Sequence, residues 1–130
     1  MLKITKEIEY SLIAIRHMSN NKNICSAREL SDNYNIPYEV MAKILQKLSK
    51  AKYINSHRGS RGGYYLNTPI YTVNFIDFIE QIEGPFGLVQ CITDTNCNVS
   101  DTCNIKSPIN KINTNIRNIL SQVTLHDIAN

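Results

Sequence analysis

The sequence predicts a mainly helical fold that carries one small β-hairpin. Apolar residues recur every three or four positions over most of the chain, and one basic, glycine-rich stretch between two short β-like runs interrupts that spacing. The chain has 130 residues, of which 42% are hydrophobic. This is the size and composition of one compact domain, which excludes a multidomain enzyme.

The first two helices are predicted from apolar spacing and from a capping pattern. Apolar residues at helical spacing run from Ile4 to Met18, and the asparagine-rich residues 20–23 end this segment. Ser26 is followed three positions later by Glu29, which is the spacing of a capping box. We therefore expect a second, short helix over residues 27–34.

A third helix and the hairpin complete the first half of the chain. After a turn at residues 35–37, a helix is expected from Tyr38, and its polar side is basic. The apolar side of this helix holds Val40, Met41, Ile44, Leu45 and Leu48. The β-like runs 53–56 and 63–66 flank a tip that is rich in arginine and glycine, so they predict a hairpin. Helix, turn, helix and hairpin follow one another as in a winged helix-turn-helix.

The segment after the hairpin predicts one more helix and then a long loop. A helix is expected over residues 73–83, because Gly84 and Pro85 end the helical pattern. Residues 86–106 lack helical spacing and contain three cysteines, so we expect a loop of about twenty residues there. A loop of this length in a small domain usually has a function.

The last segment predicts a helix that packs against another helix. Ser107 and Pro108 are typical residues for a helix start. The apolar residues that follow have coiled-coil spacing, and they are Ile109, Ile112, Ile116, Ile119 and Val123. We expect this seam to pair with a second copy of the chain and so to form a homodimer. The alternative is that the seam packs on the chain's own first helix.

The basic helix and the arginine-bearing hairpin point to double-stranded DNA as a partner. A helix can enter the major groove, and arginines on a wing reach phosphates or the minor groove. The net charge of +3 permits this function without demonstrating it, since phosphates respond to local charge. We expect DNA contacts at Pro37, Tyr38, Glu39, Lys43, Lys47, Arg58, Gly59, Arg61 and Gly62. The alternatives are a solvated surface role for any single lysine and a packing role for Tyr38.

Three evenly spaced cysteines form the second group of residues with chemical potential. Cys91, Cys97 and Cys103 have five residues between each pair, and soft thiolates in one loop suit an iron–sulfur cluster or zinc. Thiol switching and chemically idle cysteines are the alternatives. Cys25 stands apart and is expected to be a small buried hydrophobe.

The remaining polar residues predict neither catalysis nor a further metal site. The three histidines at positions 17, 57 and 126 have no glutamate or cysteine at a metal-ligand spacing, so we expect structural or surface roles for them. No catalytic triad, phosphate loop or carboxylate pair can be assembled, and we expect no enzyme. The chain shows no apolar run long enough for a membrane span and no signal-peptide core, which predicts a soluble, cytosolic protein without a membrane partner.

Taken together, these residues resemble the family of dimeric winged-helix bacterial regulators that includes the iron–sulfur cluster regulator IscR and the nitric-oxide-sensing repressor NsrR. The likeness spans Lys6 and Tyr10, residues 36–48, the wing glycines and Arg58, the cysteine triplet, and the closing residues 124–128. It implies that the cysteines bind a 2Fe-2S or 4Fe-4S cluster and that the last long helix crosses to a partner subunit. It also implies that the wing arginine meets the minor groove.

The resemblance also bears on a fourth cluster ligand. Members similar to the iron–sulfur regulator have a histidine four residues after the third cysteine, where this chain has Ser107. Members similar to the nitric-oxide sensor take a carboxylate from the partner's first helix, at the position of Glu9. Glu9 is therefore the candidate, and its alternative is a solvated helix residue.

These expectations combine into one functional prediction and two rivals. We expect a DNA-binding region over residues 1–83, a cluster loop over 84–106, and a dimerisation helix with a C-terminal tail over 107–130, all in one structural domain. The predicted function is a dimeric transcriptional regulator controlled by an iron–sulfur cluster. The rivals are a cluster-free regulator governed by cysteine oxidation or a partner protein, and a small iron–sulfur carrier, which leaves the basic helix unexplained.

Overall fold

The computed structural model describes residues 4–21, 23–60, 62–85 and 106–129. Its elements follow in the order α1 (Lys6–Asn20), α2 (Ala27–Tyr34), α3 (Tyr38–Lys50), β1 (Ile54–His57), β2 (Gly63–Leu66), η1 (Ile70–Thr72), α4 (Phe75–Glu83), α6 (Lys106–Ser121) and α7 (Leu125–Ala129). The predicted helices and hairpin are confirmed, with ends that differ by up to two residues; α4, for example, begins at Phe75 where the prediction began at Val73. The 3₁₀ turn η1 and the last helix α7 were not predicted.

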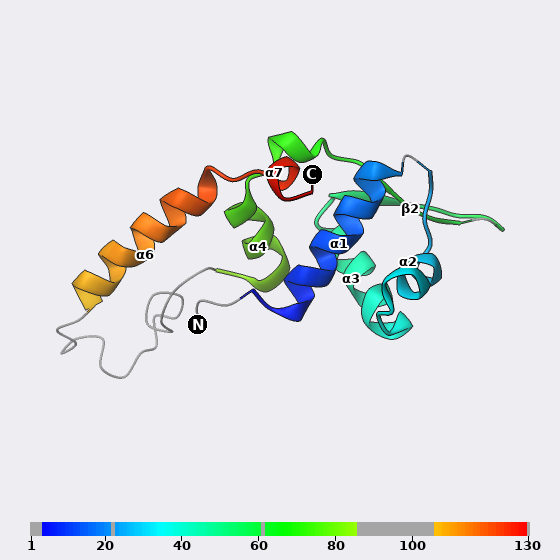
Figure 1. Cartoon of the computed structure of the whole chain (residues 1–130), viewed down its shortest axis with the longest axis horizontal. Helices are drawn as coiled ribbons and strands as arrows, with labels where there is room; N and C mark the ends of the chain where they lie inside the picture. Colours follow the sequence, from blue (N-terminus) through cyan, green and yellow to red (C-terminus); the bar gives the residue numbers. More distant parts are fainter. Residues whose placement is uncertain (1–3, 22, 61, 86–105, 130) are drawn as a thin grey trace.

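The molecule is elongated, with the hairpin at one end and α6 at the other (Figure 1). Between them, α1 packs against α3 and α7, and α2 packs against α3. Strands β1 and β2 pair antiparallel, with Ile54 opposite Leu66 and His57 opposite Gly63. We call this hairpin, together with its tip at residues 58–62, the wing.

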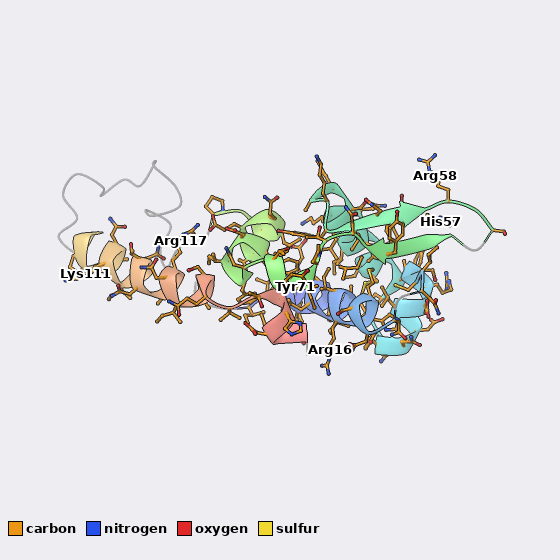
Figure 2. All side chains as sticks on the ribbon, turned by 90° about the horizontal axis from the view of Figure 1, so that it is seen from above. Arg16, His57, Arg58, Tyr71, Lys111 and Arg117 are labelled. Atoms are coloured by element: carbon orange, nitrogen blue, oxygen red, sulfur yellow. The ribbon has the colours of Figure 1, made fainter. Side chains whose placement is uncertain are left out.

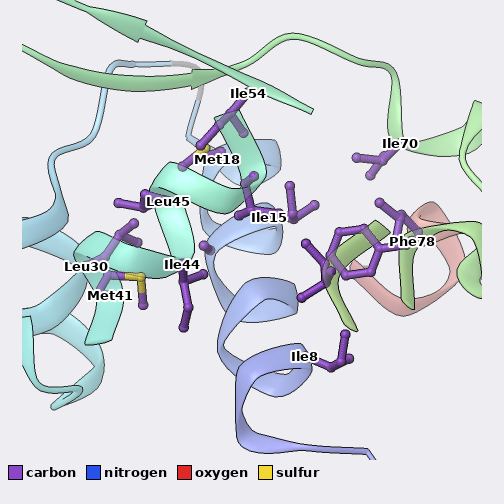
Figure 3. Close-up of a cluster of buried hydrophobic side chains, with 14 of the residues drawn as sticks. Ile8, Ile15, Met18, Leu30, Met41, Ile44, Leu45, Ile54, Ile70 and Phe78 are labelled. Atoms are coloured by element: carbon purple, nitrogen blue, oxygen red, sulfur yellow. The ribbon is translucent and has the colours of Figure 1, made fainter. Parts of the chain in front are cut away.

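One apolar core lies between α1, α3, α4 and the base of the wing (Figure 3). Ile8 and Ile15 on α1 and Phe78 on α4 are each 1% exposed or less. The buried residues of α3 are Met41, Ile44, Leu45 and Leu48, as its spacing predicts. Val40 is 39% exposed, so its predicted place on the apolar side is wrong. It lies one position before Met41, which turns its side chain away from the core.

Side-chain caps explain where several helices begin. The hydroxyl of Ser26 accepts a hydrogen bond from the Glu29 amide at the start of α2, as the capping pattern predicts. Asn74 caps α4 in the same way through the Asp77 amide. Asn35 ends α2 in the left-handed conformation at φ 53°, which asparagine tolerates better than most residues. Of these residues, Asn35 is the one that turns the chain from α2 toward the start of α3.

The wing is joined to the helical body by a short backbone pairing before α2. The Cys25 amide donates to the Tyr64 carbonyl at 2.9 Å, and the Tyr64 amide donates to the Cys25 carbonyl at 2.7 Å. A Cβ atom on Gly63 would lie 2.6 Å from the Cys25 carbonyl oxygen. Glycine is therefore required for the two backbones to approach this closely.

The end of the chain returns to the core through α7. Leu125 is 1% exposed, and its amide donates to the Val73 carbonyl at 3.0 Å. Thr124 and Asp127 exchange hydrogen bonds in a capping box at the start of α7. These bonds hold the pKa of Asp127 below its usual value of 3.8. Residues 125–129 are thus an integral helix of the domain, where the sequence suggested only a tail.

Helix α6 extends away from the body and contacts α4, to which it is joined by an Arg117–Glu80 ion pair (Figure 1). Two residues of the predicted seam are open to solvent in the single chain, with Ile112 48% and Ile119 65% exposed. Val123, at the end of the seam, is partly buried against the core. Among the described residues, no helix is long and apolar enough to span a membrane.

Candidate nucleic-acid interface

Helix α3 presents a polar face to solvent while its other face is buried. Tyr38, Glu39 and Lys43 are exposed in its first two turns, and Lys50 is exposed in its last. Pro37 immediately precedes the helix at φ −54°, a value suited to a helix start. The first turns of α3 therefore carry the carboxylate of Glu39 and the ammonium group of Lys43, and a ligand in solution can reach both.

Tyr38 contacts a residue that the sequence did not bring to notice. The guanidinium of Arg28, on α2, lies over the Tyr38 ring at 4.7 Å from the ring centre, a cation–π arrangement. Both residues are exposed, so Tyr38 packs against Arg28 and not against the core. Arg28 adds a cation beside the start of α3. No local pattern links residues on two different helices, which is why the pair was missed.

Lys47 lies differently from the other lysines of α3. It forms an ion pair with Glu7 on α1, while its side chain stays 52% exposed. A pair between exposed groups contributes about 0.2–1 kcal/mol to stability and exchanges readily with other partners. Lys47 thus links α3 to α1, and a phosphate would have to compete with Glu7 for it.

The remaining predicted DNA contacts that the structure describes lie on the wing. His57, Arg58 and Gly59 are exposed, and Figure 2 shows Arg58 projecting from the hairpin away from the body. Gly59 has φ +140°, and a Cβ on Gly62 would lie 2.7 Å from the His57 carbonyl oxygen, so both positions need glycine. Arg61 lies outside the described residues. Packing between α3 and β1 keeps the helix and the wing next to each other.

The predicted cluster ligands are only partly within the described structure. Cys91, Cys97 and Cys103 lie outside the described residues. Glu9 sits in the first turns of α1 with its side chain 49% exposed, and it pairs with Lys6 at 3.3 Å. An exposed carboxylate in a weak surface pair can exchange that lysine for another cation, such as a metal ion. The predicted role of Glu9 stays a prediction.

A second group of donors comes together away from these cysteines. One ligand atom from each of His17, Cys25 and Glu29 lies within 4.8 Å of the other two. Cys25 is 2% exposed, as predicted for a buried thiol. Burial and the nearby Glu29 carboxylate raise the pKa of Cys25 to about 11. The sequence spacing of His17 did not indicate this group, because the fold brings together residues from three separate segments.

Three comparisons relate the chain to known proteins. Residues 4–130 match the model of the Rrf2 family, described as an iron-dependent transcriptional regulator. The HTH-type transcriptional regulator NsrR of Bacillus licheniformis is 28% identical over 98% of this chain and 92% of that protein. The structure is similar to that of CymR, the global cysteine regulator of B. subtilis, with a TM-score of 0.75 and 23% identity over 99% of this chain and 97% of that one.

The structure of IscR from T. potens is also similar, with a TM-score of 0.70 and 22% identity over 98% of this chain and 85% of that one. These likenesses confirm the predicted helical fold with a hairpin wing, since they cover nearly the whole of each chain. The B. licheniformis relative is named as a transcriptional regulator, and the family description uses the same term.

Proposed function

The chain belongs to the Rrf2 family of transcriptional regulators, and from this premise we propose that it is a cytosolic homodimer that binds double-stranded DNA under the control of an iron–sulfur cluster. One observation carries the DNA-binding proposal. Helix α3 exposes a cationic face next to a wing whose Arg58 projects into solvent (Figure 2). A helix and a basic wing held side by side fit the two grooves of a duplex.

The proposed DNA contacts are of two kinds, those that recognise base edges and those that position the protein on the DNA backbone. Glu39 and Lys43 lie in the first two turns of α3, where side chains reach base edges in the major groove, and they would choose the sequence. Pro37 and Tyr38 set the start of this helix. Arg58 and Arg61 would meet phosphates or the minor groove. The other proposed wing contacts are Gly59 and Gly62, and Lys47 would add a phosphate contact.

The homodimer is proposed on the exposed apolar side of α6. Ile112 and Ile119 are 48% and 65% exposed in the single chain, and burying the part of each side chain that is still exposed would contribute about 1–2 kcal/mol each. A second copy of α6 offers the matching apolar surface. Replacement of Ile112 by aspartate would place a charge in that contact. Sedimentation should then report a monomer that keeps its helical content, and an unchanged dimer mass would contradict the proposal.

The cluster is proposed on the three thiolates of Cys91, Cys97 and Cys103, with Glu9 from the second subunit as the fourth ligand. The donor set fits, because thiolates are the preferred ligands of iron in such clusters. When bound, the cluster would supply a metal centre whose state depends on iron supply, oxygen or nitric oxide. The exposed Glu9 carboxylate is a harder and weaker donor to iron than a thiolate. The iron bound by Glu9 would therefore exchange its protein ligand most readily.

The test of DNA binding begins with a duplex selected by the protein from a random pool. Arg58→Ala should weaken binding and make its salt dependence shallower by about two units of slope, because each subunit of the dimer loses one phosphate contact. Ser60→Ala, at the same tip, is the matched control and should bind normally. Equal affinity and equal salt slope for Arg58→Ala and the control would contradict the wing contact.

The test of the cluster uses protein isolated without oxygen. Iron and sulfide should be present in the native chain and lost in Cys91→Ser, while Glu9→Ala should retain a cluster that oxidants destroy faster. Cys25→Ser should leave the iron and sulfide content unchanged. A Glu9→Ala protein with the spectrum and oxidant response of the native one would remove Glu9 from the site.

A cluster-free regulator governed by cysteine oxidation is the second candidate. It is supported by the structural likeness to CymR, which has also been solved in an oxidized form from Staphylococcus aureus. Protein that is isolated without oxygen and contains no iron, yet loses DNA binding after peroxide treatment, would establish this alternative. DNA binding distinguishes both regulators from an iron–sulfur carrier. A carrier should not bind a selected duplex with an affinity that falls steeply as salt rises.

A further inference from the structure

We propose that His17, Cys25 and Glu29 form a binding site for one divalent transition-metal ion of the zinc class, separate from the cysteine triplet at positions 91, 97 and 103. The three residues come from α1, from the segment before α2, and from α2 itself. They supply nitrogen, sulfur and oxygen, the three donor types that zinc accepts in proteins. This site does not depend on the proposed DNA binding or on the proposed cluster.

The spacing of the donor atoms is close to that of a coordinated ion. All three lie within 4.8 Å of one another. Zinc at about 2.0–2.3 Å from each ligand would hold them roughly 3.3–3.8 Å apart. Closing this difference requires a small movement of one side chain. Glu29 is exposed, so it can rotate toward the ion without disturbing the core.

His17 is already oriented by a second residue. Its Nδ1 atom lies 2.9 Å from the Tyr34 hydroxyl, and the two rings meet edge to face at 87° with their centres 5.6 Å apart. Such a hydrogen bond selects the ring tautomer and leaves Nε2 as the nitrogen for an ion. His17 and Tyr34 also line a cavity of about 350 Å³ through which a hydrated ion can approach the ring.

Cys25 is held in place from the other side. Its backbone exchanges two hydrogen bonds with Tyr64 on the wing, at 2.9 and 2.7 Å, which limits the positions its Sγ atom can take. An ion bound here would displace the proton of the Cys25 thiol, because a metal ligates the thiolate form. The resulting thiolate and the Glu29 carboxylate would together balance the two positive charges of the ion.

A metal ion at this position would connect separate parts of the fold. It would join α1 to the start of α2, and through the Cys25–Tyr64 pairing it would act on the base of the wing. Three protein ligands leave one tetrahedral position for water or a small molecule. The bound ion would therefore tighten the connection between the wing and the helix-turn-helix.

The test uses cobalt(II) as a coloured substitute for zinc. It is carried out on the full chain with Cys91, Cys97 and Cys103 replaced by serine, so that Cys25 is the one remaining thiol. We expect one cobalt ion per chain and a thiolate-to-cobalt charge-transfer absorption. Adding Cys25→Ser should abolish that absorption. Adding Glu29→Gln should weaken cobalt binding by about tenfold or more.

Asp32→Asn is the matched control for Glu29→Gln, because Asp32 is an exposed carboxylate on the same helix and lies outside the donor group. It should leave cobalt binding unchanged. A folded triple-serine protein without the absorption, or an absorption that persists after Cys25→Ser, would overturn the proposal. Equal losses in Glu29→Gln and Asp32→Asn would remove Glu29 from the site.

A second measurement covers the case in which the triple-serine chain does not fold. The native chain and its Cys25→Ser variant are loaded with zinc after iron has been removed, and bound zinc is counted by elemental analysis. The variant should hold one zinc ion fewer per chain and should lose the zinc-dependent rise in its melting temperature. Equal zinc content in the two proteins would overturn the proposal. Neither measurement involves DNA, so failure of the proposed function leaves this result intact.

Discussion

Gly63 offers a sharp test of how the wing is joined to the helical body. In Gly63→Ala, the new methyl group would lie 2.6 Å from the Cys25 carbonyl oxygen and 2.8 Å from Cγ2 of Ile24, so one of the two backbones must move. The movement breaks or lengthens the two hydrogen bonds between Cys25 and Tyr64. Each contributes about 1 kcal/mol, which gives a loss of about 2 kcal/mol.

Part of that loss is offset, because alanine restricts the unfolded chain more than glycine does and stabilises by about 0.5 kcal/mol. We therefore expect Gly63→Ala to lower the free energy of unfolding by about 1.5 kcal/mol, or roughly 5–7 °C in melting temperature for a domain of this size. Urea unfolding at one fixed protein concentration measures this difference.

Ser60→Ala is the control for Gly63→Ala, because Ser60 is exposed at the wing tip. It should change the free energy of unfolding by less than about 0.5 kcal/mol. The Gly63 variant should also bind DNA more weakly, since the base of its wing is displaced. If Gly63→Ala is as stable as Ser60→Ala, the close approach of Gly63 to Cys25 is refuted.

Three further predictions follow from α7 and from the buried thiol. Leu125→Ala should cost about 2–5 kcal/mol in urea unfolding because Leu125 is 1% exposed, whereas Ile119→Ala, at a 65% exposed position, should leave the fold of the monomer unchanged. Asp127 has a lowered pKa, so its contribution to stability is present above its usual value of 3.8 and is lost as the pH falls through the folded value. Asp127→Asn should therefore be less stable than the native chain near about pH 6, and the two should converge in acid; a constant gap would contradict the assigned bonds to Thr124. Metal-free Cys25, with a pKa of about 11, should be alkylated slowly at neutral pH and rapidly after unfolding, and peptide mass analysis showing equal rates would contradict its burial.

Local signals in the sequence were enough to predict most elements of the fold. The cap at Ser26 and the bend at Gly84 depend on residues within four positions, so the sequence alone places the bounds of α2 and the end of α4. The order of helices and hairpin, with the cationic face of α3 beside arginine and glycine, predicted the winged fold. The family came from a resemblance of particular residues over nearly the whole chain, including the cysteine triplet. Each cap, helix end and charge pattern depends on residues that are close together in the sequence.

The tertiary structure decided which distant residues meet. His17, Cys25 and Glu29 converge from three segments, and their spacing of eight and four residues matches no metal motif. The pairing of Lys47 with Glu7 likewise depends on how α1 packs on α3. Periodicity identifies the buried face of a helix but not the partner that this face contacts.

Helix α7 shows the same division at the end of the chain. Its five residues are too few to be stable alone, and helices this short depend on tertiary packing. Leu125 becomes a core residue because α7 packs against α1 and η1. The sequence by itself thus determined the longer helices, their caps, the wing and the family. Folding determined the partners of those elements, because long-range contacts depend on how complete helices fit together.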